Sequence, residues 1–359
     1  MRLSPRQVLG MALAMYTLAS CATNPVVIPE PERGSDFSYS DLRNEDLRGA
    51  SLRYADFDLS DLSGSLLENA DLTGANLYAT GLRNADLTGA NLAGADLTGT
   101  NLTGTNLTGT NLTGTNLTGT NLAGTNLTGA NLTGTILRGL NLQEISLEGT
   151  TLKDADLAGA NLADAGLIDT DLTGADLTGA DLAGGTFNGS VFDQSDLSKA
   201  DFRGSDLSEA SFVGTTLDQA QLAGAVLLNA NFHAASLRSV DLSDQTIRLN
   251  TLFHSDLTGS NLSGTDLANQ NLGRASLRAS DLSGTNLTGT YLQEADLWTA
   301  NLTGANLTGA NLIDANLTGA NLTGANLTGA NLLRTAVQDT NLTDVITTGA
   351  VQDDSWPTQ

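Results

Sequence analysis

The chain has 359 residues, 39 of them glycine, and a formal net charge of −24. This acidity argues against nucleic acid as a direct partner, because phosphates would be repelled. Aromatic residues make up only 4% of the chain, and low aromatic content with high acidity is typical of disorder. The apolar residues, however, recur at a fixed spacing, which indicates a folded repeat array instead.

The first 20 residues have the features of a secretion signal. Arg2 and Arg6 precede an apolar stretch over residues 8–19. A membrane-spanning helix needs about 20 apolar residues, so this shorter stretch predicts the core of a signal peptide. It ends in the tetrad LASC at 18–21. The tetrad resembles the lipoprotein box of bacteria, in which the cysteine is lipidated and becomes the first residue of the mature chain.

This resemblance implies a lipid bilayer as one partner, held through lipidated Cys21. The predicted segments are a lipoprotein signal peptide over 1–20 and a lipidated cysteine with a proline-rich tether over 21–34. Ala22 stands where an aspartate would suggest retention in the inner membrane, so we expect the outer membrane, facing the periplasm. A plain secretory signal with an incidental cysteine remains the alternative. Cys21 is the only cysteine, so no intramolecular disulfide can form.

A five-residue pattern fills most of the remaining chain. From Phe37 to Leu342, every fifth residue is Leu, Phe, Ile or Val, without insertion or deletion. A small residue, usually Ala, Ser or Thr, stands two positions before most of these centres, and Asp or Asn usually stands one before. Polar residues follow the centre, often ending in glycine, which suits corners that need a positive φ. A period of five fits neither a helix nor a simple strand.

The pattern resembles that of the pentapeptide-repeat family. The resemblance implies an all-β fold over 35–344, a right-handed quadrilateral parallel β-helix of about 15 coils with 20 residues in each. Each side of a coil would hold one repeat, with the centre and the small residue pointing inward.

Residues spaced by twenty should therefore stack. We expect Phe192, Phe212 and Phe232 to stack in the core, and stacked asparagines to form a hydrogen-bonded ladder. One such column holds Asn101, Asn121, Asn141 and Asn161.

No catalytic constellation is visible in the sequence. The chain has two histidines, and its one cysteine is assigned to the anchor. We therefore predict no catalytic residue, no cofactor and no enzyme activity. The best-known members of the family are acidic β-helices that mimic DNA and bind gyrase. Against that reading, no charged residue lies between Asp96 and Arg138, and the signal directs the chain away from gyrase; it remains the alternative.

Outward positions spaced by twenty predict one partner-binding face. Along it, apolar and aromatic residues replace the usual threonine, and a charged column runs beside them. An apolar stripe edged by charge is typical of docking surfaces. The first column holds Val213, His233, Phe253, Gly273, Gln293, Ile313 and Leu333, and the second holds His254, Arg274, Glu294, Asp314 and Arg334.

We take as the candidate face Val213, His233, Phe253, His254, Arg274, Ile313 and Leu333. Two other readings stay open, a diverged surface without function and metal binding by the two histidines. Two ligands seldom suffice for a metal, so no metal is predicted. The neighbouring repeats are irregular, since Val240, Gln245 and Asn250 take three successive small positions.

The tail, residues 345–359, abandons the pattern but keeps apolar residues such as Val345 and Trp356. A β-helix must cover its end or risk pairing with other chains, so we expect a cap or a homodimer contact there. The sequence as a whole predicts a membrane-anchored, non-catalytic envelope lipoprotein whose rigid β-helix is a structural or protein-binding scaffold, with an unidentified protein as partner.

Overall fold

The computed structural model describes residues 34–143, 145–243, 252–354 and 356. The chain divides into an N-terminal unit, Met1–Asp171, and a C-terminal unit, Leu172–Gln359. The described residues contain no helix, and each β-bridge is a single residue long. Among these residues, nothing forms a helix long and apolar enough to cross a membrane.

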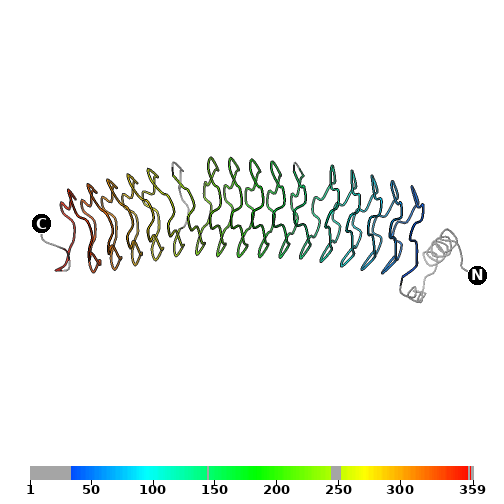
Figure 1. The fold of residues 1–359 in the computed structure, drawn as a ribbon, viewed down its shortest axis with the longest axis horizontal. Helices are drawn as coiled ribbons and strands as arrows, with labels where there is room; N and C mark the ends of the chain where they lie inside the picture. The colour runs from blue at the N-terminus through cyan, green and yellow to red at the C-terminus, as the bar shows by residue number, and fades with distance from the viewer. Residues whose placement is uncertain (1–33, 144, 244–251, 355, 357–359) are drawn as a thin grey trace, which may run out of the picture. The chain divides into compact units, whose positions relative to one another are not determined.

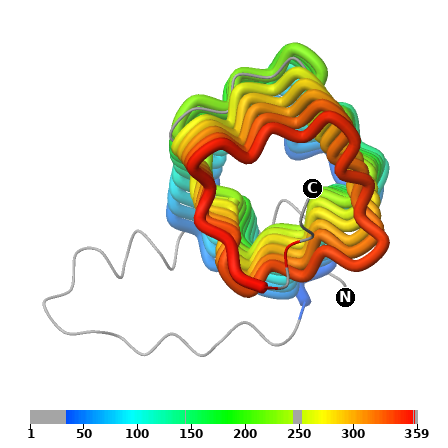
Figure 2. Tube along the Cα trace, turned by 90° about the vertical axis from the view of Figure 1, so that its left-hand side faces the viewer, coloured from blue at the N-terminus to red at the C-terminus, as the bar shows by residue number. Residues whose placement is uncertain are grey.

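Both units are parallel β-helices. Each bridge joins a residue to the one twenty positions later, as in Asn101↔Asn121 of the N-terminal unit and Asn311↔Asn331 of the C-terminal unit. Bridges recur every five residues, so each coil has four sides (Figure 1). Figure 2 shows the four-sided wall at the end of the C-terminal unit. The predicted right-handed quadrilateral parallel β-helix is confirmed.

Backbone hydrogen bonds between coils hold this register. The N–H of most centres donates to a carbonyl of the next coil, as from Leu42 to Asp61 at 2.8 Å. The N–H of Asp61 in turn donates back to the carbonyl of Ser40 at 2.9 Å. These bonds pair main-chain groups at the bridges, so the register does not depend on which side chain stands there.

The inward positions form the core of each unit. The centre leucines, such as Leu102 and Leu107, are fully buried, and so are the small residues two positions earlier. Where that small residue is threonine, its hydroxyl donates either to a carbonyl of the previous coil or to one three residues earlier, as Thr115 Oγ1 does to the Leu112 oxygen at 2.8 Å. Thr105 Oγ1 donates to the Leu82 oxygen at 2.8 Å. The uncharged tract at 101–120 is therefore scaffold, with its buried hydroxyls satisfied.

Aromatic centres replace leucine in part of the C-terminal unit. The rings of Phe192 and Phe212 stack with centroids 5.0 Å apart, and those of Phe212 and Phe232 stack at 4.9 Å. This confirms the predicted stack. Phe187 and Phe202 join the same cluster with edge-on contacts to Phe192 at 5.9 Å, an addition that the twenty-residue spacing did not indicate.

The asparagine ladder forms only in part. In the column of Asn101 and Asn121, the side-chain oxygen accepts from its own turn, as from Thr103 N at 3.1 Å and Thr103 Oγ1 at 2.7 Å. Amide bonds between coils occur in other columns, from Asn111 to Asn91 and, with aspartate as acceptor, from Asn316 to Asp296, both at 2.9 Å. The side-chain oxygen of asparagine therefore bonds to its own turn, and only some columns add a bond between coils.

The coil pattern continues past residue 344. Ile346 bridges to Asn326 and Val351 to Asn331, although Thr347 stands where a leucine centre would be. Figure 2 shows the red end of the described chain turning inward. The Trp356 side chain is buried, with 7% exposure. The backbone N–H of Trp356 donates to the backbone carbonyl oxygen of Asp353 at 3.1 Å.

Candidate interaction surface

The candidate face lies along one side of the C-terminal unit. Its aromatic part is built by stacking, because the His233 and Phe253 rings lie parallel with centroids 5.6 Å apart. The Phe253 ring also covers Gly273, where an added Cβ would lie 3.3 Å from two ring carbons. Phe253 is consequently outside the core, as its outward position predicts, and is half-buried.

The remaining apolar members of the face are also half-buried. This group comprises Val213, Ile313 and Leu333. Together they form a shallow apolar stripe along one side of the β-helix, in which each side chain keeps part of its apolar area accessible to solvent.

The charged column beside this stripe is paired internally. Arg274 donates to both carboxylate oxygens of Glu294, at 3.0 and 3.3 Å, and Arg334 donates to both oxygens of Asp314, at 2.6 and 2.7 Å. The hydrogen bond from Arg334 holds the pKa of Asp314 below its usual value. Ion pairs as exposed as these add little stability, so their main effect is to present a fixed, nearly neutral edge.

The two histidines lie at the same face, but the structure does not complete a metal site around them. Phe253 stacks on His233 and lies with its centroid 6.2 Å from that of His254. Among the described residues, no group of three or more His, Cys, Asp or Glu side chains is placed to hold a metal ion.

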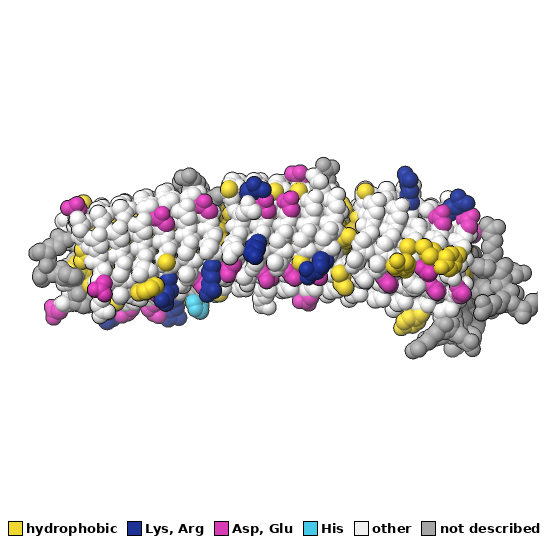
Figure 3. Space-filling model, in the orientation of Figure 1, with side chains coloured by type: hydrophobic (Ala, Val, Ile, Leu, Met, Phe, Trp, Pro, Cys, Tyr) yellow, Lys and Arg dark blue, Asp and Glu magenta, His cyan; other side chains and the backbone are white. Residues whose placement is uncertain are grey.

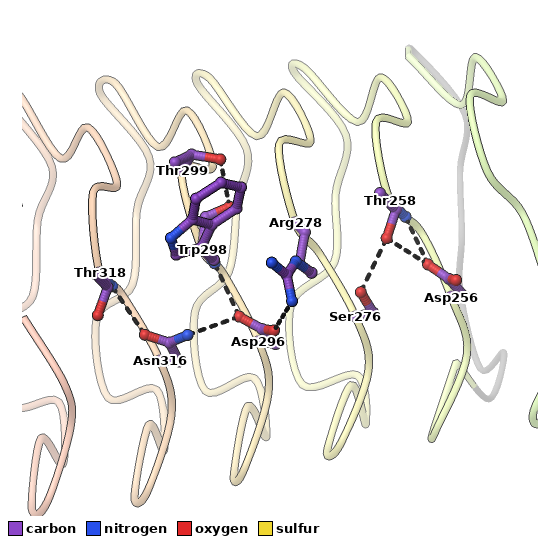
Figure 4. Close-up of polar contacts among 9 residues, drawn as sticks. All are labelled: Asp256, Thr258, Ser276, Arg278, Asp296, Trp298, Thr299, Asn316 and Thr318. Carbon is purple, nitrogen blue, oxygen red and sulfur yellow. Dashed lines mark hydrogen bonds and ion pairs between the residues drawn. The ribbon is translucent and has the colours of Figure 1, made fainter.

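A second surface feature, which the sequence reasoning missed, lies on the neighbouring side of the C-terminal unit (Figure 4). The Arg278 guanidinium lies 4.8 Å from the centroid of the Trp298 ring, a cation–π contact. Arg278 also pairs with Asp296 at 3.3 Å, and Asp296 accepts from Trp298 N and from Asn316. The twenty-residue spacing of Arg278 and Trp298 places them one above the other, and this spacing could have indicated the contact.

A third feature is a cluster of exposed apolar side chains in the N-terminal unit. Tyr39, Leu59 and Tyr78 are 73%, 47% and 48% exposed. Hydrophobic side chains gather at this end of the unit in Figure 3. They occupy outward turn positions that elsewhere hold threonine or glycine, and this departure from the pattern could have revealed them.

Some of the sequence predictions fall outside the described residues. These are Cys21, with the signal peptide and most of the tether, and the irregular positions Gln245 and Asn250. Val240, the first of the irregular small positions, is buried in the core. Leu140 and Ile145, which also replace small residues, are buried as well.

Comparison with known proteins identifies the repeat. The family model for pentapeptide repeats matches the chain over residues 33–139, 141–244 and 252–344. No curated protein matches.

Among solved structures, three illustrate the range of similarity. HetL, a pentapeptide repeat protein involved in heterocyst differentiation regulation from the cyanobacterium Nostoc, is 30% identical, with 62% of this chain and 91% of that chain covered and a TM-score of 0.26. The pentapeptide repeat protein Rfr23 from the cyanobacterium Cyanothece is 32% identical, with 35% and 86% covered and a TM-score of 0.21. QnrB1, a plasmid-mediated fluoroquinolone resistance protein, is 19% identical, with 63% and 91% covered and a TM-score of 0.21.

These TM-scores are too low for the superpositions to carry an argument. The family model covers most of the chain, and its five-residue unit is the one that the bridges and the buried centres show. The chain belongs to the pentapeptide-repeat family.

Proposed function

We propose that the chain is a lipid-anchored, non-catalytic protein of the cell envelope whose β-helix presents a binding surface to a protein partner. The observation that carries the anchor is the tetrad LASC at 18–21, placed directly after an apolar stretch too short to span a membrane. Pentapeptide-repeat proteins are generally non-catalytic scaffolds, and the chain has their repeat.

The state of the carboxylates supports a non-catalytic role. Burial raises the pKa of Asp206, but hydrogen bonds from Ser208 outweigh this and hold the pKa below its ordinary value. Hydrogen bonds from Thr258 and Arg238 outweigh burial in the same way at Asp256. A general acid near neutral pH needs a raised pKa, so these carboxylates are suited to holding turns.

Partner binding is assigned to the candidate face of the C-terminal unit. Its apolar stripe offers area that a partner can remove from water. The paired charges at its edge need not be separated when a partner binds. They can therefore orient the partner at a low desolvation cost. We therefore expect a protein partner with a matching apolar ridge.

The anchor is tested by Cys21→Ala. The variant is expected to lose metabolic fatty-acid label and to accumulate as precursor or leave the membrane fraction, because no other thiol is present. Thr23→Ala, which leaves the tetrad intact, is the control and should be labelled normally. Fatty-acid label in Cys21→Ala at the wild-type level would overturn the anchor.

The face is tested by Phe253→Asp with Ile313→Asp and Leu333→Asp. Crosslinking in intact cells should then recover the partner at several-fold lower yield, because three carboxylates would have to be desolvated in the contact. The control places equal charge on the opposite side of the same coils, Ser263→Asp with Thr323→Asp and Thr343→Asp. Circular dichroism checks that both variants fold. Full crosslinking yield in the first variant excludes this face as the docking surface.

A further inference from the structure

Three exposed apolar side chains lie together on one side of the first coils of the N-terminal unit, and Tyr54, which is 52% exposed, lies on the neighbouring side. We call Tyr39, Leu59 and Tyr78 the tyrosine patch; they follow the centres Phe37, Phe57 and Leu77, which belong to the same side. Two coils further on, the equivalent positions carry Thr118 and Gly119. The patch is therefore confined to the beginning of the unit.

The charge of this side differs from that of the other three. On those sides, the position after the centre holds Arg43, Arg48 and Arg53, each paired with an aspartate. The segments that carry the patch, 35–39, 55–59 and 75–79, contain three aspartates and no lysine or arginine. The aspartates are Asp36, Asp56 and Asp58. The patch is thus an apolar and aromatic surface in acidic surroundings.

The position of the patch along the chain limits what can cover it. The described chain begins at Gly34, about 13 residues after Cys21, and 13 extended residues span at most about 45 Å. The three coils of the patch add only about 5 Å each. If Cys21 is anchored, the patch is held within this distance of the bilayer surface.

We propose that the tyrosine patch contacts the interface of the bilayer, and that its preferred surface is zwitterionic lipid such as phosphatidylethanolamine. Tyrosine is enriched at membrane interfaces, where its ring is apolar and its hydroxyl meets water and headgroups. Lipid ammonium groups complement the three aspartates, whereas anionic lipid repels them. The patch adds a second membrane contact to the acyl anchor, and so turns this side of the N-terminal unit toward the membrane.

This inference rests on the proposed anchor, and its test is designed to be independent of lipidation in cells. The full chain with Cys21→Ser and an N-terminal hexahistidine tag is bound to phosphatidylcholine–phosphatidylethanolamine vesicles that contain a nickel-chelating lipid. A single cysteine introduced by Leu59→Cys then carries an environment-sensitive NBD label. The matched control is Arg48→Cys, on the opposite side of the same coil.

The label at residue 59 is expected to be quenched at least twofold more than the label at residue 48 by lipids that carry a shallow nitroxide. Replacing part of the zwitterionic lipid by phosphatidylglycerol should reduce this difference. Tyr39→Ser with Tyr78→Ser should abolish it, and Tyr291→Ser, an exposed tyrosine of the C-terminal unit, should leave it unchanged.

Equal quenching at residues 59 and 48 would overturn the proposal. Protection of the residue 59 label in native membranes but not on vesicles would also overturn it, since the occupant would then be a protein. Failure of the proposed anchor has a different signature, which is fatty-acid label in Cys21→Ala at the wild-type level. Selective quenching at residue 59 together with that result would leave the bilayer contact standing and remove only the anchor.

Discussion

Among the described residues, the one two positions after a centre adopts a left-handed conformation whatever its type. Gly304 has a φ of 67°, and Asn84 and Asn269 have φ values of 54° and 60°. Asparagine tolerates this region better than most residues, whereas a β-branched residue is strained there. Thr299 nevertheless adopts a φ of 55°, and its hydroxyl donates to the Trp298 oxygen at 2.7 Å.

We expect Thr299→Asn to stabilise the C-terminal unit by about 0.5–1 kcal/mol, because it removes the β-branch from a left-handed position. The same arrangement with asparagine already exists in the N-terminal unit. There Asn84 lies one coil before Gly104, just as Thr299 lies one coil before Gly319. Gly304→Ala is the converse control. An added Cβ at Gly304 meets nothing within 4 Å, so its expected loss of about 1 kcal/mol reports backbone strain alone. Thermal unfolding measures both, and a lower midpoint for Thr299→Asn contradicts the argument.

At the scale of the coil, some outward aspartates link their own turn to a neighbouring coil. Asp256 accepts from Thr258 N at 3.0 Å and from Thr258 Oγ1 at 2.5 Å, and it also accepts from Arg238 Nε at 2.7 Å. Burial raises the pKa of Asp256, but these hydrogen bonds together lower it below the ordinary value. Arg238 belongs to the preceding coil, so the carboxylate contributes to the contact between coils.

This lowered pKa predicts a pH-dependent contribution to stability. A carboxyl group with a lower pKa in the folded state stabilises the fold above its unfolded pKa, near 4, and loses that contribution as the pH falls through the folded value. Asp256→Asn keeps an acceptor for the turn but removes the charge. It should cost about 0.5–1 kcal/mol at pH 7, and this difference from wild type should vanish toward pH 2.

Urea unfolding of both proteins at pH 7, 5 and 3 measures the difference. Arg238→Gln should show the same loss at pH 7, because it removes the other partner of the pair. A stability difference between wild type and Asp256→Asn that is the same at pH 7 and pH 3 would show that the charge of Asp256 is not responsible.

At the scale of the whole molecule, the last coil of the C-terminal unit is less buried than the coils before it. The last centres, Val337 and Leu342, are half-buried, whereas Leu332 is fully buried. The backbone of the tail satisfies groups of the previous coil, since Leu327 N donates to the Ile346 oxygen at 2.7 Å and Leu332 N donates to the Val351 oxygen at 2.8 Å. The tail therefore completes the final coil.

Deletion of residues 345–359 is expected to cause aggregation or a change in oligomeric state, because it exposes the donors of an open β-edge. Size-exclusion chromatography with light scattering gives the mass in solution. Deletion of residues 357–359 alone is the control and should leave the mass unchanged. A monodisperse product of unchanged oligomeric state after the longer deletion would argue against both a cap and a homodimer contact.

The sequence by itself determined the repeat, the register and the core. A period of five with a large apolar centre and a small residue two positions earlier resembles the pentapeptide repeat, and that resemblance implies coils in which both residues point inward. The stack of Phe192, Phe212 and Phe232 followed from the same period, because residues twenty apart must lie above one another. The apolar stretch at 8–19 and the tetrad LASC suggest an anchor, which rests on the sequence alone.

Only the tertiary structure decided which outward side chains meet. An arginine one position after its centre pairs with its own turn in Arg43–Asp41 but with a carboxylate eighteen residues later in Arg238–Asp256. Arg274, two positions after its centre, pairs with Glu294 twenty residues later. All three partners lie within the reach of a long side chain, and the choice depends on local acceptors and rotamers. The sequence period places residues in columns, but contacts across those columns are set by side-chain packing in three dimensions.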